Sequence, residues 1–160
     1  MILDDEVFAV VLAISVVLSV VGIAVSLPRP SENFAAIGLL NKEGKIGDYP
    51  SNVRVGQVVS LNVFVYNHLG YTALFRVDVK VGDGEVPSNT TPLPKPPLFS
   101  LYTLLGDYEN ATIPFNVTFT YPMVNQTLVL ELYDYSPDNS TWVYMGEYVF
   151  LRLNVTGVVL

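Results

Sequence analysis

The pattern of apolar and polar residues divides the chain into one continuous apolar segment and a long stretch of alternating residues. Residues 7–27 carry no charge, and a helix of that length spans about 31 Å, close to the hydrocarbon thickness of a bilayer. From residue 34 onward apolar and polar residues alternate, which is typical of β-strands. The pattern predicts a helix in residues 1–27, a linker in residues 28–33 and a β-domain in residues 34–160.

The apolar segment is interpreted as a retained transmembrane helix, not as a cleaved signal peptide. Residues 24–26 (Ala-Val-Ser) offer a cleavage site, but a signal peptide needs a basic segment before its apolar core, and residues 4–6 are Asp-Asp-Glu. Arg29 follows the helix, so the positive-inside rule would place the C-terminal side of the helix, and with it the β-domain, in the cytosol. Acidic residues count little in that rule, however, and long domains cross largely regardless of charge. We expect a cytosolic N-terminus and an extracellular β-domain.

Small residues form a stripe along this predicted helix, at spacings of four, three and four. They are Ser15, Ser19, Gly22 and Ser26. Small residues let helix backbones approach closely in lipid, although they are also common in transmembrane helices in general. The partners expected for residues 7–27 are therefore the lipid bilayer or like helices.

The alternating region predicts seven or eight short strands, and hence an antiparallel immunoglobulin-like β-sandwich, so that the fold class is mainly β. The clearest strands are residues 58–66 and 71–81, which residues 67–70 are predicted to join as a hairpin. His68, the only histidine, is interpreted as a turn residue of that hairpin. Residues 98–105 are compatible with a strand or a short helix.

The remaining strands are predicted at residues 34–40, 112–121, 128–135 and 142–155, with a further extended segment ending near residue 56. The last two strands form a hairpin around the turn residues 137–139 (Pro-Asp-Asn). In a regular hairpin Leu132 would face Tyr144 and Asp134 would face Trp142, and Gly146 is a candidate β-bulge. Residues 82–97 contain five prolines, which favours an extended, semi-rigid spacer.

The strongest chemical signal is a set of six Asn-X-Ser/Thr motifs, which are acceptors for N-linked glycans when they are exposed outside the cytosol. The asparagines are Asn89, Asn110, Asn116, Asn125, Asn139 and Asn154. Asn89, Asn110, Asn125 and Asn139 fall in predicted loops or turns. Asn116 and Asn154 lie inside predicted strands, but each alternates with apolar neighbours and so belongs to the polar face.

The first half of the β-domain has no such motif. Glycans are therefore expected to cover the second half and to leave a bare surface over residues 34–81. That surface would serve for contact with a protein partner or a second copy, or it would simply be buried or close to the membrane.

Composition excludes several functional classes. The net charge of −7 argues against nucleic acid, because phosphate binding needs clustered Lys and Arg. The chain has no cysteine, so disulfides, thiolate zinc sites and cysteine nucleophiles are excluded. No residue pattern indicates a metal or another cofactor.

Enzymatic chemistry would need positioned titratable groups. The carboxylate pairs near one another in sequence are Asp107 with Glu109, Glu131 with Asp134, and Asp83 with Glu85. Nothing distinguishes them from carboxylates of turns and loop rims, and the protein is expected not to be an enzyme. A carbohydrate-binding module is a further alternative, because five aromatic residues on the closing hairpin could form a stacking platform: Tyr133, Tyr135, Trp142, Tyr144 and Tyr148.

Several short segments follow one another in a characteristic order. They are Glu32-Asn33-Phe34, residues 37–40, 44–45, 48–50, 55–56, 65–68 and 77–82, and the closing hairpin with Trp142, Tyr148 and residues 152–155. This order resembles an archaeal family of membrane-anchored extracytoplasmic β-sandwiches, the domain of unknown function family numbered sixteen-sixteen. The resemblance implies an archaeal surface protein and carries over no functional residues.

The expected function is that of a non-enzymatic, N-glycosylated structural or interaction protein of the cell surface, anchored by a single span and acting alone or within a larger envelope complex. In an alternative interpretation the chain resembles an archaeal type IV pilin, with the helices bundled into the core of an extracellular filament. Glu6 would be the fifth residue after removal of Met1, as in the pilin pattern, but no basic leader with a processing site precedes it in this sequence.

Overall fold

A computed structural model describes residues 4–28 and 32–157. The chain forms two compact units, an N-terminal helical unit up to Glu32 and a β-domain from Asn33 onward. Arg29, which entered the topology argument, and Met1, which entered the pilin alternative, lie outside the described residues.

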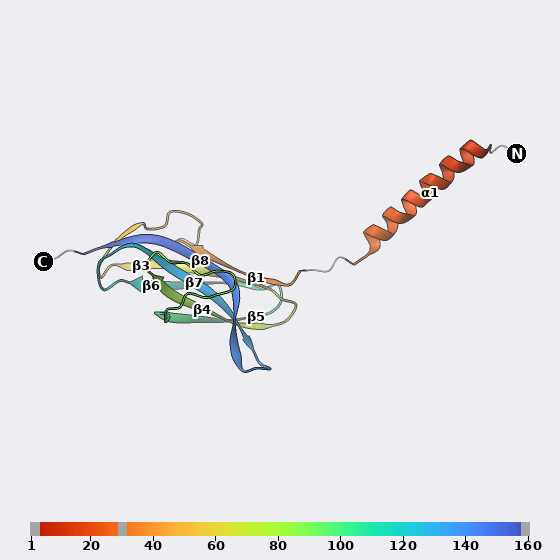
Figure 1. The fold of residues 1–160 in the computed structure, drawn as a ribbon. Coiled ribbons are helices and arrows are strands. Elements are labelled where there is room, and N and C mark those ends of the chain that lie inside the picture. Colours follow the sequence, from red (N-terminus) through yellow and green to blue (C-terminus); the bar gives the residue numbers. More distant parts are fainter. Residues whose placement is uncertain (1–3, 29–31, 158–160) are drawn as a thin grey trace. The chain divides into compact units, whose positions relative to one another are not determined.

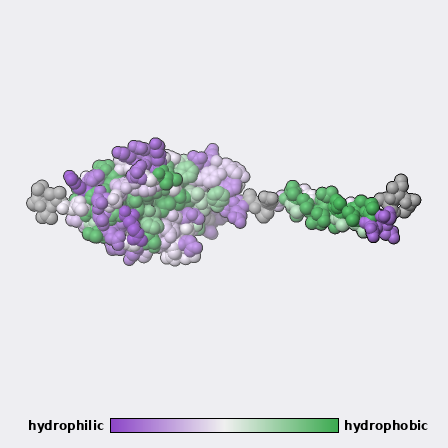
Figure 2. All heavy atoms as spheres, turned by 90° about the horizontal axis from the view of Figure 1, so that it is seen from above, coloured by the Kyte–Doolittle hydropathy of each residue, from purple (hydrophilic) through white to green (hydrophobic). Residues whose placement is uncertain are grey.

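Helix α1 runs over Asp5–Ser26 and is apolar along its length except at its N-terminal end (Figure 2). Its 22 residues are enough to cross a membrane, a property that signal sequences share. The Asp4 carboxylate caps the helix by accepting a hydrogen bond from the Val7 N–H at 3.1 Å, and Asp5 and Glu6 lie in the first turn, where negative charge stabilises the helix dipole. The acidic residues that argue against a signal peptide thus have a local role in starting the helix.

The small-residue stripe is exposed on α1, and its hydroxyl groups are satisfied within the helix. Ser15 donates to the Val11 carbonyl at 2.8 Å, Ser19 to the Ser15 carbonyl at 2.7 Å, and Ser26 to the Ile23 carbonyl at 3.0 Å. A Cβ atom added at Gly22 would meet no atom within 4 Å. The side chains of the stripe are therefore short, and their hydroxyl donors are already hydrogen-bonded within the helix. Such a surface suits contact with lipid or with another apolar helix.

We expect Ser19→Ile to weaken self-association of α1 in a membrane dimerisation assay, because the larger side chain keeps two backbones apart at the centre of the stripe. Val17→Ile, outside the stripe, is the matched control and should leave the signal unchanged. An undiminished signal for Ser19→Ile would remove the stripe from any account of assembly.

The β-domain consists of eight strands in its described residues, arranged as two sheets (Figure 1). The three-stranded sheet has the order β1-β3-β6 and the five-stranded sheet the order β2-β8-β7-β4-β5. The strands are β1 (Phe34–Leu40), β2 (Asn52–Arg54), β3 (Val58–His68), β4 (Ala73–Gly82), β5 (Phe99–Leu105), β6 (Asn110–Thr118), β7 (Met123–Ser136) and β8 (Thr141–Thr156). Residues 98–105, which were compatible with a strand or a short helix, thus contain the edge strand β5.

This strand order confirms the predicted antiparallel, immunoglobulin-like sandwich. Every pairing is antiparallel except that of β2, which pairs in parallel with β8. One sheet holds β1, β3 and β6 and the other holds the remaining five strands. Two antiparallel sheets packed in this way are typical of immunoglobulin-like domains.

The predicted hairpin between residues 58–66 and 71–81 is wrong. β3 pairs with β1 and β6, whereas β4 pairs with β5 and β7, so the chain crosses from one sheet to the other after His68. The buried Asn67 fixes this corner, because its side-chain amide donates to the carbonyls of Tyr71 at 2.8 Å and Leu105 at 2.9 Å. His68 is the last residue of β3 and not a turn residue.

The core follows the predicted alternation in the three-stranded sheet. The inward residues of β3 are buried and its outward residues are not, with Val63 and Val65 completely buried. β7 differs, because it is buried on both faces from Gln126 to Tyr133. Residues 83–98, the proline-rich loop between β4 and β5, cover the outer face of the five-stranded sheet and cause this second burial. The loop is a cover and not the spacer that was predicted.

The closing hairpin of β7 and β8 exists, but its register differs by one residue from the prediction. Tyr133 faces Tyr144, and Tyr135 faces Trp142. The difference arises because residues 137–140 all belong to the turn, with Ser140 in the left-handed region at φ 49°. The predicted bulge is confirmed: the register shifts between Glu131 and Tyr133, opposite Gly146 at φ 76°.

Candidate functional site

The six predicted acceptor asparagines lie at the surface of the β-domain. Asn89, Asn110, Asn116, Asn125 and Asn139 are exposed, and Asn154 is partly buried. In β6 and β8 the parity argument is confirmed, because Phe115, Val117, Leu153 and Val155 are buried on the opposite face. Modification of these residues stays a prediction, but the fold leaves room for glycans at five of the six positions.

Two of the six candidate glycosylation asparagines use their side chains in hydrogen bonds within the domain. Asn116 accepts one from the Ser60 hydroxyl at 2.9 Å. Asn154 accepts one from the Asn125 N–H at 2.7 Å and donates one to the Asn52 side chain at 3.4 Å. Asn154 is therefore the acceptor that the folded domain holds most tightly.

The motif at Asn125 has a buried hydroxyl. Thr127 is completely buried, and its hydroxyl donates to the Glu85 carbonyl of the covering loop at 2.5 Å. A transferase that reads this hydroxyl can reach it only before the loop closes. We therefore expect any modification of Asn125 to precede folding.

The glycan-free half stays a prediction, but the fold divides residues 34–81 between the two sheets. Strands from the two halves of the sequence alternate within the sheets: β3 lies between β1 and β6, and β4 lies between β5 and β7. Asn110 and Asn116 on β6 are direct cross-strand partners of Tyr66 and Ser60 on β3. Residues 34–81 consequently do not form a surface of their own.

The aromatic residues weighed as a sugar platform share the outer face of the five-stranded sheet but are largely occupied. The Arg76 guanidinium lies 4.4 Å from the ring centre of Tyr133 and 4.9 Å from that of Trp142, and the Asp78 carboxylate holds it at 2.8 Å. Tyr144 donates its hydroxyl to the Ser88 carbonyl at 2.7 Å, and burial raises its pKa to about 12. These contacts indicate that the rings bind the loop and the neighbouring strands together.

The carboxylate pairs considered for catalysis are not brought together as acid and base. Glu131 is completely buried on the outer face of β7, whereas Asp134 accepts a hydrogen bond from the Tyr71 hydroxyl at 2.6 Å. Asp107 accepts from the Gly70 N–H at 3.0 Å, which joins the corner after β3 to the turn before β6, and Glu109 accepts from the Gly106 N–H at 2.7 Å within that turn.

The remaining pair, Asp83 and Glu85, is also structural. Asp83 contacts Lys95 at 2.9 Å, and this ammonium group lowers the pKa of the carboxyl. Glu85 contributes its carbonyl to the bond with Thr127.

An ion pair that sequence patterns did not indicate holds the covering loop. Lys80 Nζ lies 2.7 Å from Glu131 Oε2, with both side chains buried. Lys80 also donates to the Leu93 carbonyl at 2.9 Å, and the Leu93 N–H donates to Glu131 at 2.6 Å. The Tyr133 hydroxyl donates to the same carboxylate at 3.0 Å. Each partner is thus both paired and hydrogen-bonded, which a buried ion pair requires.

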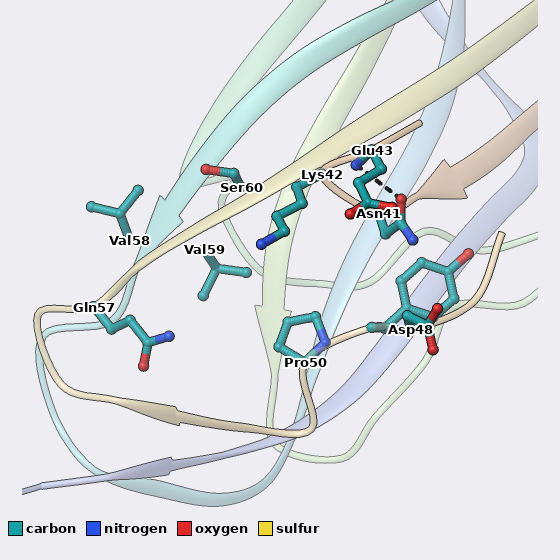
Figure 3. A pocket seen from close by; sticks show the side chains of 10 residues that line it. Asn41, Lys42, Glu43, Asp48, Pro50, Gln57, Val58, Val59 and Ser60 are labelled. Atoms are coloured by element: carbon teal, nitrogen blue, oxygen red, sulfur yellow. Dashed lines mark hydrogen bonds between the residues drawn. The ribbon is translucent and has the colours of Figure 1, made fainter. Parts of the chain in front are cut away.

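A hollow of about 520 Å³ lies between the loop after β1 and the start of β3 (Figure 3). Asn41 shapes the loop, accepting from the backbone N–H groups of Glu43 at 2.9 Å and Lys45 at 3.0 Å. The hollow is lined by Lys42, Glu43 and Asp48 together with apolar and amide side chains. In the described part of the chain no three His, Asp or Glu side chains are grouped to hold a metal ion.

A partly exposed aromatic cluster lies where β1 begins and β3 ends, and it comprises Phe34, Tyr66, His68 and Tyr108. The His68 ring is central, with its centre 5.0 Å from that of Phe34, 6.3 Å from that of Tyr66 and 4.6 Å from that of Tyr108. Sequence reasoning missed this cluster because its members come from β1, β3 and the turn before β6. Phe34 and His68 become neighbours only through the register of β1 with β3, which no local sequence pattern indicated.

Comparisons with known proteins show no relative by sequence: no family model matches this chain, and no curated protein matches it. Among solved structures, a β-glucosidase from Listeria innocua with glucose is 12% identical with a TM-score of 0.48, covering 83% of this chain and 17% of the enzyme. The CARDB domain of a Pyrococcus furiosus protein with di-metal ions is 15% identical with a TM-score of 0.47, covering 82% of this chain and 95% of that domain. This chain therefore spans under a fifth of the β-glucosidase, and neither similarity carries an argument about function.

Proposed function

We propose that this protein is a non-enzymatic, N-glycosylated domain displayed outside the cell by a single transmembrane helix, where it serves as a structural or interaction subunit of the envelope. The observation that carries the proposal is that the same chain contains an unburied apolar helix and a sandwich on which five of the six candidate asparagines are exposed. Membership of the archaeal sixteen-sixteen family is part of the same proposal.

The contacts of the titratable groups support a non-enzymatic role. Glu131, Asp107 and Glu109 are each bound to a backbone group or a basic side chain. The Asp134 carboxylate beside the Tyr71 hydroxyl raises the pKa of that tyrosine to about 12. A tyrosine with that pKa stays neutral and is a poor proton donor near neutral pH.

Glycopeptide mass spectrometry of the protein from its native cells tests the proposal. We expect glycan masses at the exposed acceptors, with Asn154 the least modified. Asn52 is the matched control within the chain, because it is exposed but has Arg54 where the motif needs a hydroxyl. Protease added to intact cells should digest the β-domain. Unmodified asparagines, together with digestion only after the membrane is opened, would contradict the proposal.

The filament alternative predicts a different distribution of the protein. Helices bundled into a core would place this chain in sheared surface filaments visible by electron microscopy, with Met1 removed so that Glu6 is the fifth residue. Recovery only from detergent-solubilised membrane would exclude the filament and favour the anchored form.

A further inference from the structure

The aromatic cluster of Phe34, Tyr66, His68 and Tyr108 is unusual because apolar ring surface is left in solvent. Tyr108 is 64% exposed and Phe34 is 47% exposed. Exposed apolar residues that cluster on a surface can mark a site of contact. The inward face of the same sheet already forms the core, so these rings contribute nothing to it.

The turn that carries Tyr108 is held rigidly. The Tyr108 N–H donates to the Asn67 carbonyl at 2.8 Å, and the Asn67 N–H donates to the Glu109 carbonyl at 2.9 Å. Tyr108 itself adopts φ 64°, a left-handed conformation that costs energy for a residue with a side chain. The turn therefore holds Tyr108 in a strained backbone conformation, with its ring against that of His68.

Asn110 stands at the edge of this cluster. It is the cross-strand partner of Tyr66, it is exposed, and it follows Tyr108 by two residues. Thr112, the hydroxyl residue of its motif, is exposed on the same face of β6. A group attached to Asn110 consequently emerges beside two rings of the cluster.

The other five acceptors lack this arrangement. The residues two positions before them are Pro87, Pro114, Met123, Pro137 and Arg152. Asn110 is thus the one acceptor of the six that follows an aromatic residue at this distance.

Resting on the proposed glycosylation, we propose that the aromatic cluster receives the first sugar residues of an N-linked glycan on Asn110, with the sugar attached to Asn110 stacked on the Tyr108 ring. The C–H groups on one face of a pyranose carry partial positive charge, and the face of an aromatic ring is negative. A sugar stacked there removes apolar ring surface from water while its hydroxyls stay solvated. The glycan then stabilises the turn between β5 and β6 in addition to shielding it.

The test is a double-mutant cycle on the full-length glycoprotein, purified in detergent from its native cells. Tyr108→Ala and Asn110→Gln are made singly and together, and thermal unfolding of each is measured. We expect Tyr108→Ala to lower Tm by at least about 3 °C more when the Asn110 glycan is present than when it is absent, a shift that corresponds to about 1 kcal/mol in a domain of this size. Tyr108→Phe, which keeps the ring, should restore the difference.

Two controls separate the glycan from the fold. Tyr121 is an exposed tyrosine outside the cluster, and Tyr121→Ala should act equally with and without the Asn110 glycan. Asn139→Gln removes an acceptor that follows Pro137, and its effect should simply add to that of Tyr108→Ala.

The failures are distinguishable. A Tyr108→Ala effect that is the same in both backgrounds overturns this inference and leaves the proposed function standing. An unmodified Asn110 among modified acceptors does the same. An effect that appears only in lipid vesicles and ignores the glycan would assign the rings to a lipid surface and would also overturn it. A complete absence of glycans overturns both proposals.

Discussion

Replacing Glu131 by leucine is expected to lower the free energy of unfolding by about 3–5 kcal/mol, because the Lys80 ammonium is then buried without a counter-charge. The two side chains are in contact at 2.7 Å and both are buried. The same substitution removes the acceptor for the Leu93 N–H, so the covering loop loses its central attachment. Urea denaturation of the solubilised protein, followed by circular dichroism, measures the change.

A second variant makes this result specific to the charge. In Lys80→Met with Glu131→Leu both charges are gone, and stability should recover most of the loss, since removing a complete buried ion pair is often close to neutral. Asp83→Asn is the surface control, because it breaks the exposed contact with Lys95 and should change stability little. Equal destabilisation of the single and double variants would show that packing, and not charge, holds the loop.

Asn67→Leu is expected to cost about 3–5 kcal/mol of unfolding free energy, because it leaves buried backbone groups without partners. The Asn67 side chain donates to two carbonyls and accepts from the Leu69 N–H at 2.9 Å. Leucine has a similar volume, so the loss reports hydrogen bonding and not a cavity. Thermal unfolding gives the size of the effect.

Hydrogen exchange locates the same effect. Amides in residues 69–72 and 105–110 should exchange faster, because Asn67 joins the corner after β3 to the turn before β6. Asn62→Leu is the matched control: Asn62 is only partly buried and donates a single hydrogen bond, to the Asn41 carbonyl at 2.8 Å, so about 1 kcal/mol is expected. A loss for Asn67→Leu no larger than that would contradict the role assigned to this residue.

The strand positions followed from sequence because alternation is a local property. In β3 the residues predicted to face inward are the buried ones, and the polar parity of Asn116 was also correct. A bulge at Gly146 could be anticipated because a glycine inside a strand pattern often marks one.

The pairing of β3 with β4 was predicted wrongly because a four-residue connection between strands is compatible with two structures that have the same local sequence pattern. It can reverse the chain within one sheet, as in a hairpin, or carry it to the facing sheet. Asn67 decides between them through its bond to Leu105, a residue 38 positions away that no local pattern connects to it.

Burial of Lys80 and Glu131 shows the same limit. Both residues occupy the outward positions of their strands, where alternation predicts solvent. They are buried because the loop of residues 83–98 folds back over the sheet, and the prolines of that loop indicated only that it is extended. The aromatic cluster around His68 likewise depends on three separated segments meeting at one end of a sheet.

Reading the residues in order was enough to recognise an apolar helix, a β-domain and the six Asn-X-Ser/Thr motifs, since each of these depends on side chains within a few positions of one another. Membership of each strand in a sheet, the cover over β4 and β7, and the rings gathered beside Asn110 required the folded chain. These features depend on contacts between residues far apart in sequence, whose free energy appears only when the two sheets and their loop pack together.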